Sequence, residues 1–520
     1  MKWVFAVLLA TVMFVPTKHA LFIFQQNRYE TGRYKAWISD NVKRLAGENR
    51  FYLLMCLAGF VAGMIKGWIG NIILVLILVL SAFLLFFSEK NTTYIKPLVY
   101  TARVKRQISV LVLLETLWTA ALILSGYSAF FYISAYLMPW VLIWPMAGIT
   151  EPVEAAVRNH YLSEAKKILK EDTQLIKIGI TGSFGKTTTK NIMQAMVSEK
   201  YNSLMTPASY NTPMGITRTI REMLKPIHRV FVCEMGADHV GDIRELMEFV
   251  QPSIGVVTSI GPQHLNTFGS QENITKEKMR MIEMLPEDGF GVLNYDNEFI
   301  RNYHIQNKVK VVTYGIHNDK TDYHAEDITY TSTGSSFTVV CKEGRFPLET
   351  KLLGELNILN ILSAVAVARH LNISWEEIRK AVKGMKQVEH RLELKKINGY
   401  RFIDDAFNAN PTGSRMALEV LSMMPGTRYI VTPGMIDLGP RQEQVNHDFG
   451  TFMKDKADIV ILVGRIQTEP IYKGLQDSGF DMNSVLVVDK VNEAFQYVYT
   501  HATPSDTILL ENDLPDAFNH

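Results

Sequence analysis

A run of small and polar residues at positions 181–189, Thr-Gly-Ser-Phe-Gly-Lys-Thr-Thr-Thr, has the composition of a phosphate-binding loop. It follows a short apolar stretch and precedes a stretch with helical character. Glycines between a strand and a helix let backbone N–H groups approach phosphate oxygens at the helix N-terminus. The pattern predicts a P-loop rather than a plain glycine turn, although Ile180 stands where the usual pattern has its first glycine. The predicted nucleotide-binding residues are Gly182, Ser183, Gly185, Lys186, Thr187 and Thr188.

A carboxylate and an imidazole follow the next two apolar stretches. Glu234 comes directly after residues 229–233, and His264 comes shortly after residues 254–259. In open α/β sheets the carboxyl ends of parallel strands line the crevice where ligands bind. We therefore expect both side chains beside the P-loop. The alternatives are an ordinary surface ion pair for Glu234 and a turn histidine for His264.

Further motifs follow in a fixed order along the chain, and together with the P-loop they carry a family resemblance. They read Glu-Met-Gly-Ala, His-Leu-Asn-Thr-Phe-Gly-Ser, Asn-Ile-Leu-Asn, His-Arg-Leu and Asp-Asp-Ala-Phe-Asn-Ala-Asn-Pro, at residues 234–237, 264–270, 357–360, 390–392 and 404–411. From about residue 175 onwards the chain resembles the Mur ligase family, most closely its MurF branch. The resemblance implies ATP-dependent joining of a carboxylate to an amine through an acyl phosphate.

The resemblance also implies roles for single residues. Glu234 and Thr187 would hold one Mg²⁺, and His264 a second. Lys278 matches a lysine that is carbamylated in the family, which turns a cation into an oxygen donor for a hard metal ion; Lys276 competes for this role. The implied catalytic residues are Lys186, His264 and Lys278.

Other implied contacts concern the nucleotide and the substrate. Asn357, with Asn360 on the same helical face, would contact the adenine. Arg391 would reach the phosphates after domain closure, and Asp405 would lie at the same seam. Weaker substrate candidates are Asn211 and Thr212, in a loop near the carboxylate substrate for which a plain turn is about as good an interpretation. Asn408, which would lie at the seam with Asp405, is a third.

Alternating apolar stretches and helical patterns position these residues. Residues 172–383 are expected to form a central P-loop ATPase domain, and residues 384–520 a C-terminal Rossmann-like α/β domain that binds the amine and closes over ATP. Its strands are expected at 401–404, 429–432, 459–463 and 485–488.

The first 150 residues have a different character. Apolar stretches cover residues 3–24, 51–65, 68–87, 108–125 and 127–149, while Lys and Arg concentrate at 24–50 and 88–107. Because basic residues favour cytoplasmic loops, this pattern predicts an α-helical, multi-pass region in the cell membrane with its N-terminus outside and the ligase domains in the cytoplasm. Buried helices of a soluble protein are the alternative. Residues 151–171 are expected to form a connecting helix, and Glu115 lies inside the fourth stretch, where an ionisable group is a functional hypothesis.

Composition excludes several classes of protein. The 520 residues are 47% hydrophobic and 20% charged, which excludes a disordered chain. A net charge of +2 predicts no nucleic-acid partner. The three cysteines, Cys56, Cys233 and Cys341, are too few and too scattered for a disulfide framework or a zinc site.

Two departures from the family bear on the substrate. Membrane spans stand where family members have a domain for the UDP end of the substrate, so the expected carboxylate acceptor is presented at the membrane and is lipid-linked or membrane-adjacent. Where the MurF branch has a basic Lys-Gly-Ser-Arg loop near its end, residues 510–516 read Leu-Glu-Asn-Asp-Leu-Pro-Asp. The expected amine, an amino acid or dipeptide, then carries a free positive charge and no carboxylate close to it.

The sequence is also compatible with other functions. One is the standard addition of D-alanyl-D-alanine to UDP-N-acetylmuramoyl-tripeptide, and another is a polyglutamylation-type ligase. The last is an ATP-gated transport or scaffold protein.

Overall fold

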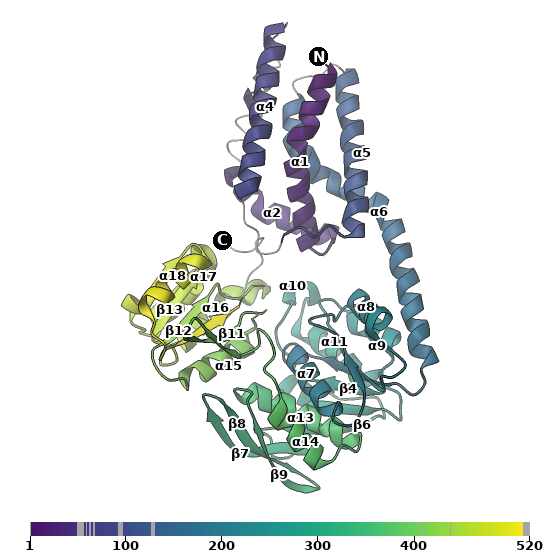
Figure 1. Cartoon of the computed structure of the whole chain (residues 1–520), viewed down its shortest axis with the longest axis vertical. Coiled ribbons are helices and arrows are strands. Elements are labelled where there is room, and N and C mark those ends of the chain that lie inside the picture. The colour runs from purple at the N-terminus through teal and green to yellow at the C-terminus, as the bar shows by residue number, and fades with distance from the viewer. Residues whose placement is uncertain are drawn as a thin grey trace. The chain divides into compact units, whose positions relative to one another are not determined.

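The computed structural model describes residues 2–48, 57–58, 60–61, 64–65, 68–91, 97–125, 130–407, 409–436 and 438–512. Within this part, the chain divides into two compact units, Met1–Asn159 and His160–Leu514, shown in Figure 1. Each unit has hydrophobic clusters of its own.

The first unit is helical. Its helices are α1 (Lys2–Gln26), α2 (Thr31–Glu48), α4 (Trp68–Asn91), α5 (Ala102–Ser125) and the part of α6 (Phe130–Glu171) up to residue 159. The prediction of a separate connecting helix at residues 151–171 is wrong in one respect: these residues are helical, but they continue α6 without a break. Most of the predicted stretch 51–65 lies outside the described residues.

Helix α2 lies in a segment that the sequence pattern treated as a basic loop. Its apolar residues are spaced at helical intervals among charges, and Tyr34 and Trp37 are buried. The Tyr34 hydroxyl donates to the carbonyl of Trp140 at 3.1 Å. A half-buried amphipathic helix therefore replaces the expected loop.

Two of the described helical stretches, Val7–Gln26 and Trp68–Lys90, are long and apolar enough to cross a membrane. Polar side chains link some helices of this unit: Thr17 donates to Glu115 at 2.5 Å, and Arg106 makes a two-bond pair with Glu154 at 2.7 and 2.8 Å. Glu115 is thus hydrogen-bonded within its unit.

The second unit begins with a nine-stranded sheet in the order β2-β3-β1-β4-β5-β6-β7-β8-β9. Strands from β2 to β7 pair in parallel, and β7, β8 and β9 pair antiparallel. The strands are β1 (Ile176–Thr181), β2 (Ser203–Met205), β3 (Val230–Glu234), β4 (Ile254–Val257), β5 (Phe290–Asn294), β6 (Lys310–Gly315), β7 (Tyr323–Thr331), β8 (Gly334–Cys341) and β9 (Gly344–Thr350). The helices are α7 (Lys186–Val197), α8 (Pro213–Met223), α9 (Asp242–Val250), α10 (Leu265–Phe268), α11 (Gln271–Glu283), α12 (Glu298–Arg301), α13 (Glu355–His370) and α14 (Trp375–Gly384).

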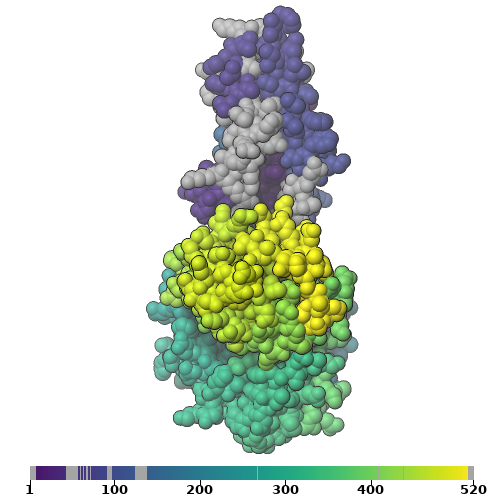
Figure 2. Space-filling view, turned by 90° about the vertical axis from the view of Figure 1, so that its left-hand side faces the viewer, coloured from purple at the N-terminus to yellow at the C-terminus, as the bar shows by residue number. Residues whose placement is uncertain are grey.

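A second sheet of six strands follows, in the order β10-β11-β15-β12-β13-β14, parallel except for the β10–β11 pair. Its strands are β10 (Glu393–Ile397), β11 (Tyr400–Asp405), β12 (Arg428–Thr432), β13 (Ile459–Val463), β14 (Val485–Val488) and β15 (Thr507–Glu511). Its helices are α15 (Pro411–Ser422), η1 (Gly439–Arg441), α16 (Gln442–Phe452), α17 (Arg465–Asp477), η2 (Met482–Ser484) and α18 (Val491–His501). The predicted fold class, a helical N-terminal region followed by P-loop and Rossmann-like α/β domains, is confirmed. The space-filling view in Figure 2 shows the yellow-green C-terminal part packed on the teal central part.

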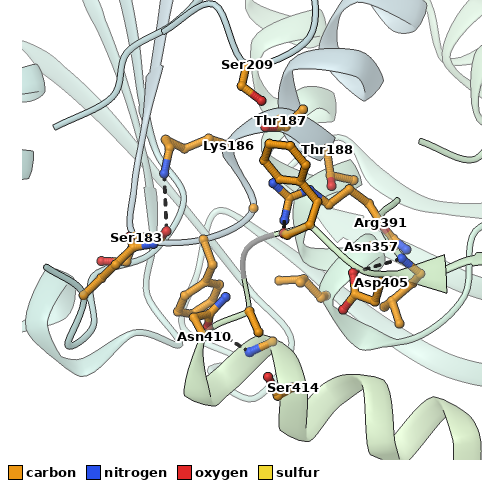
Figure 3. Close-up of a pocket in the computed structure, with 18 of the residues that line it drawn as sticks. Ser183, Lys186, Thr187, Thr188, Ser209, Asn357, Arg391, Asp405, Asn410 and Ser414 are labelled. Carbon is orange, nitrogen blue, oxygen red and sulfur yellow. Dashed lines mark hydrogen bonds between the residues drawn. The ribbon is translucent and has the colours of Figure 1, made fainter. Parts of the chain in front are cut away.

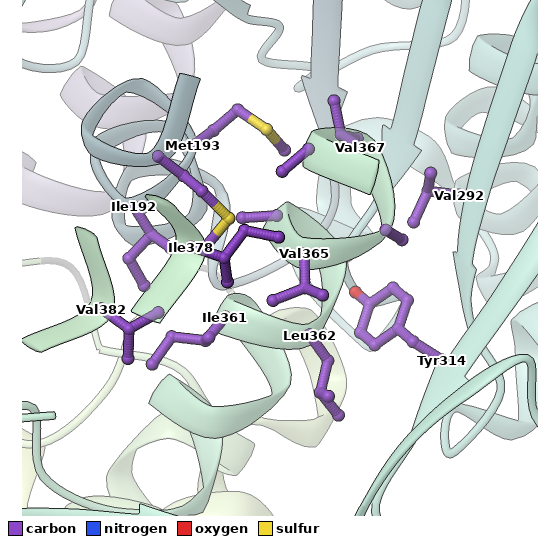
Figure 4. Close-up of a cluster of buried hydrophobic side chains, with 14 of the residues drawn as sticks. Ile192, Met193, Val292, Tyr314, Ile361, Leu362, Val365, Val367, Ile378 and Val382 are labelled. Carbon is purple, nitrogen blue, oxygen red and sulfur yellow. The ribbon is translucent and has the colours of Figure 1, made fainter. Parts of the chain in front are cut away.

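The largest core cluster holds the P-loop helix in place. Ile192 and Met193 of α7 pack with Ile361 and Val365 of α13, which is buried from Asn357 to Ala368 (Figure 4). Burial of an aliphatic side chain contributes about 1.5–3 kcal/mol. This packing fixes the start of α13 beside the start of α7.

Candidate active site

The loop between β1 and α7 depends on two glycines. Gly185 caps α7 with a φ of +83°, and a Cβ there would lie 2.9 Å from Oδ1 of Asn360. A Cβ on Gly182, with a φ of +154°, would lie 2.1 Å from Oγ1 of Thr258. The backbone can therefore turn closely into the N-terminus of α7 only with glycine at both positions. Backbone N–H groups at such a helix N-terminus suit an anion.

Lys186 is the first residue of α7 and lies over the loop. Its Nζ donates to the carbonyl oxygen of Gly182 at 2.6 Å. It also donates to that of Ser183 at 3.3 Å, which Figure 3 shows. Burial lowers the pKa of Lys186 to about 8, although the nearby charge of Glu234 opposes this effect. Its amine thus lies where an anion bound by the loop would be within its reach.

Lys278 of α11 lies against the same loop. The side chain is 1% exposed, and its Nζ donates to the carbonyl of Gly182 at 3.2 Å. Burial and the neighbouring charge of Lys186 lower the pKa of Lys278 well below its usual value. The competing candidate, Lys276, is exposed and pairs with Glu272 at 2.7 Å. The structure thus places Lys278, and not Lys276, at the loop.

Glu234 ends β3 in a buried ion pair. Its Oε2 lies 3.1 Å from Nζ of Lys190, each side chain is 1% exposed, and its Oε1 accepts a hydrogen bond from Asn211 at 3.0 Å. The pair is therefore internal, not the surface pair considered from the sequence. Sequence reasoning missed Lys190, although its spacing of four residues from Lys186 on a helix indicates that both lie on one face.

A cavity of about 110 Å³ lies between the P-loop and the C-terminal sheet, and Figure 3 shows residues of its wall. It brings together ten predicted residues: Ser183, Gly185, Lys186, Thr187, Thr188, Asn211, Glu234, Asn357, Arg391 and Asp405. Five further polar residues line it: Ser209, Gln263, Asn410, Ser414 and Glu511. Asn410 and Glu511 belong to the stretches 404–411 and 510–516 noted in the sequence, but none of the five was predicted singly as a site residue.

The remaining predicted residues are not among those that line this cavity. His264 pairs with Asp238 at 3.1 Å, and Thr212 accepts a hydrogen bond from Gly215 as the N-cap of α8. Lys278 donates to the carbonyl of Gly182, and neither residue lines the cavity. Asn408 lies outside the described residues.

The C-terminal wall carries one cation and two carboxylates. The guanidinium of Arg391 donates to the carbonyl of Phe407 at 2.6 Å and lies 4.7 Å from the centre of its ring. Burial raises the pKa of Asp405 to about 6, against the opposing charge of Arg391. The second carboxylate, Glu511, accepts a hydrogen bond from Ser414 at 2.6 Å.

Oxygen donors for a divalent cation are present in the cavity wall. Glu234 and Thr187 both line it, and carboxylate and hydroxyl oxygens suit Mg²⁺. Among the described residues no group of three or more His, Cys, Asp and Glu side chains converges as a metal site. The oxygens of Glu234 and Thr187 therefore fit a Mg²⁺ ion whose other ligands are phosphate oxygens and water.

Comparison with known proteins matches the two α/β domains. The family model described as the Mur ligase middle domain matches residues 180–368, and the one described as Mur ligase, glutamate ligase domain matches residues 390–511. A UDP-N-acetylmuramoyl-tripeptide--D-alanyl-D-alanine ligase from Bacillus subtilis is 31% identical over 341 residues, which are 64% of this chain and 72% of the relative. The enzyme of the same description from Escherichia coli is 30% identical over 55% of this chain and 64% of its own length.

Solved structures agree with this comparison. MurF from Acinetobacter baumannii has a TM-score of 0.62 at 25% identity, covering 70% of this chain and 78% of that one. MurF from Thermotoga maritima, solved in complex with ADP, has a TM-score of 0.62 at 23% identity, covering 68% of this chain and 80% of that one. At this identity the second likeness concerns the fold alone.

Proposed function

The chain belongs to the Mur ligase family of ATP-dependent amide ligases, and from this premise we propose that it adds an amino acid or dipeptide to a peptide precursor of the cell envelope. We propose further that the carboxylate acceptor of this reaction is presented at the membrane. The observation that carries the proposal is a single cavity lined by a P-loop lysine, a buried carboxylate at a strand end, and Arg391 from the following domain. These groups suit transfer of the γ-phosphate of ATP to a carboxylate.

The P-loop side handles the nucleotide. Lys186 and the N–H groups at the start of α7 bind the phosphates, while Asn357 at the start of α13 lies beside them for the adenine. Arg391 and Asp405 reach the same cavity from the C-terminal sheet, so both domains enclose the reacting groups. Exclusion of water matters here because an acyl phosphate hydrolyses when exposed.

For the metal ions we propose Glu234 and Thr187 as ligands of one Mg²⁺, and His264 with a carbamylated Lys278 for a second. Bound Mg²⁺ neutralises the charge that gathers on the phosphates during transfer. The lowered pKa of Lys278 supports carbamylation, because only a neutral amine attacks CO₂. Lys190 competes with a metal ion for Glu234, since its ammonium group lies 3.1 Å from that carboxylate.

The membrane part of the proposal has its own support. Two described helical stretches have the length and composition of spans, and the basic residues of the first 107 positions concentrate in two segments. We propose that the N-terminal region holds the enzyme at the cytoplasmic membrane, with its ligase domains in the cytoplasm. The amine donor is an amino acid or dipeptide.

The relatives' descriptions favour a second candidate, in which the chain adds D-alanyl-D-alanine to UDP-N-acetylmuramoyl-tripeptide and the membrane region serves only for location.

The test is phosphate release from ATP by the full chain in lipid nanodiscs. Acceptors are UDP-N-acetylmuramoyl-tripeptide and the same peptide on a lipid carrier, each with D-alanyl-D-alanine or single amino acids. Faster turnover of the lipid-linked acceptor supports our proposal, and faster turnover of the UDP-linked acceptor supports the second candidate. Activity that survives Lys186→Ala would remove the P-loop from the mechanism and overturn both.

A further inference from the structure

The C-terminal wall of the cavity includes Glu511, and one of its carboxylate oxygens has no hydrogen-bond partner in the part of the chain that the structure describes. Glu511 ends β15 with 1% of its surface exposed, and its Oε1 accepts the hydroxyl of Ser414 at 2.6 Å. Its Oε2 is buried and accepts no hydrogen bond from any described residue. Because a buried polar atom without a partner is costly, it indicates a functional role or a ligand group that is present during the reaction.

The position of Glu511 is fixed by its surroundings. It lies in register with Asp405 on the neighbouring parallel strand β11. The next residue, Asn512, donates to the carbonyl of Gly434 at 2.6 Å and accepts the N–H of Ala409 at 3.0 Å. The end of β15 is thereby tied to the loops after β12 and β11, so the carboxylate is held in one orientation.

Opposite charges occupy the two ends of the cavity. On the P-loop end, Lys186 and the N-terminus of α7 suit an anion. On the C-terminal end, Glu511 faces Asp405, with Arg391 as the nearby cation, and burial with the charge of Asp405 raises the pKa of Glu511 well above its usual value. An ammonium group is the ligand that would relieve this repulsion and use the free oxygen.

We propose that Glu511 binds the protonated amine of the donor substrate through Oε2 and accepts one of its protons before the amine attacks the acyl phosphate. This inference rests on the proposed ligase function. It assigns the donor a primary ammonium group, and it makes Glu511 a catalytic residue.

Protons and electron pairs balance in this step. The ammonium gives one proton to the Glu511 carboxylate and becomes a neutral amine. Its nitrogen lone pair forms the C–N bond to the acyl carbon, the C–O bond to phosphate breaks, and phosphate leaves with that electron pair. The second nitrogen proton goes to the departing phosphate, and Glu511 later returns its proton to solvent. Burial raises the pKa of Glu511, so its carboxylate is a stronger base than that of an exposed glutamate, which suits this role.

The test measures the reaction rates of the full chain carrying Glu511→Gln with two different nucleophiles. One is D-alanyl-D-alanine, whose amine is protonated at neutral pH, and the other is hydroxylamine, which is largely neutral there and traps the acyl phosphate as a hydroxamate. Glutamine keeps the hydrogen bond from Ser414 but cannot take a proton. The matched control is Glu419→Gln on α15, an exposed carboxylate paired with Lys456.

We expect Glu511→Gln to lower kcat/KM for D-alanyl-D-alanine by about 100-fold or more, as loss of a general base does. Hydroxamate formation and the KM for ATP should stay within about twofold, as should every rate of the Glu419→Gln control. An unchanged rate with D-alanyl-D-alanine would overturn the inference, and so would an equal loss with both nucleophiles. If the unaltered chain forms neither amide nor hydroxamate, the proposed function itself fails.

Discussion

At the level of single residues, the buried ion pair between Lys190 and Glu234 is the least expected feature of the site. Removing one partner of such a pair leaves an uncompensated charge, which costs about 3–5 kcal/mol, whereas the intact pair adds little to stability. Its value to the protein is therefore positional: Lys190 holds Glu234 at the end of β3 beside the P-loop.

The substitution Lys190→Met should destabilise the ligase unit by about 3–5 kcal/mol, measured by urea unfolding. Lys380→Met, which removes an exposed pair with Glu199, should cost at most about 1 kcal/mol. Adding Glu234→Gln to Lys190→Met should recover part of the loss, because the unpaired charge is then gone. A double variant less stable than Lys190→Met would contradict this account of the pair.

A second residue-level prediction concerns Lys278. Since burial lowers the pKa of its amine and so favours the neutral form, ¹³CO₂ should form a carbamate that is visible in the ¹³C NMR spectrum of the protein and absent from Lys278→Met. Lys276→Met is the control, because Lys276 is exposed and paired with Glu272. A carbamate signal that persists in Lys278→Met would assign the modification elsewhere.

The pH dependence of stability follows from Asp405. Its pKa is raised from 3.8 to about 6, so the folded state binds more protons than the unfolded state between these values. The contribution of Asp405 to stability therefore falls as pH rises from about 4 to about 6. Thermal unfolding should show Asp405→Asn gaining stability relative to the unaltered chain across this window. A difference in Tm that does not change with pH would exclude this effect.

At the level of elements, the site depends on how β1 passes into α7 and how α13 packs against it. Gly185 lies so close to Asn360 of α13 that a Cβ on it would be 2.9 Å from Oδ1 of Asn360. The position of the phosphate loop therefore depends on the position of α13. Packing of Ile192 and Met193 against α13 therefore also positions Asn357 at the cavity.

Gly185→Ala should weaken ATP binding at least tenfold, because the left-handed backbone costs about 1–2 kcal/mol and the new methyl group meets Asn360. Gly399→Ala is a matched control: its φ is +89°, and no atom lies within 4 Å of the place that a methyl group would take. It should lose similar stability and bind ATP normally in isothermal calorimetry. Equal ATP affinity in both variants would show that the loop tolerates a side chain.

At the level of the whole molecule, the chain has two compact units with separate cores. We expect a version lacking residues 1–150 to keep a cooperative thermal transition, because the ligase cores lie beyond residue 160. It should lose turnover of a lipid-linked acceptor in nanodiscs, whereas the full chain should resist alkaline extraction from membranes. Full-rate turnover of a soluble UDP-linked peptide by the shortened version would argue against a membrane-presented acceptor.

Local patterns determined part of the fold. Hydrophobic periodicity and glycine positions predicted the strand, loop and helix of the P-loop and the strands β11 to β14, because these elements follow from neighbours in the chain. The same reasoning missed α2, whose apolar residues are sparse among charges, and divided α6 into two helices where its composition changes from apolar to polar.

The sequence predicted some residues of the site but not how they pair. The sequence predicted nucleotide chemistry for Lys186 and Glu234 from the ends of apolar stretches at which they lie, and for Arg391 and Asp405 from the family resemblance. The structure brings all four to one cavity. Only the tertiary structure placed Lys190 against Glu234 and brought Glu511 into the cavity wall, with one carboxylate oxygen that no described residue hydrogen-bonds. Such pairings join residues far apart in the chain, and they are decided by sheet order, register and burial, which no local pattern records.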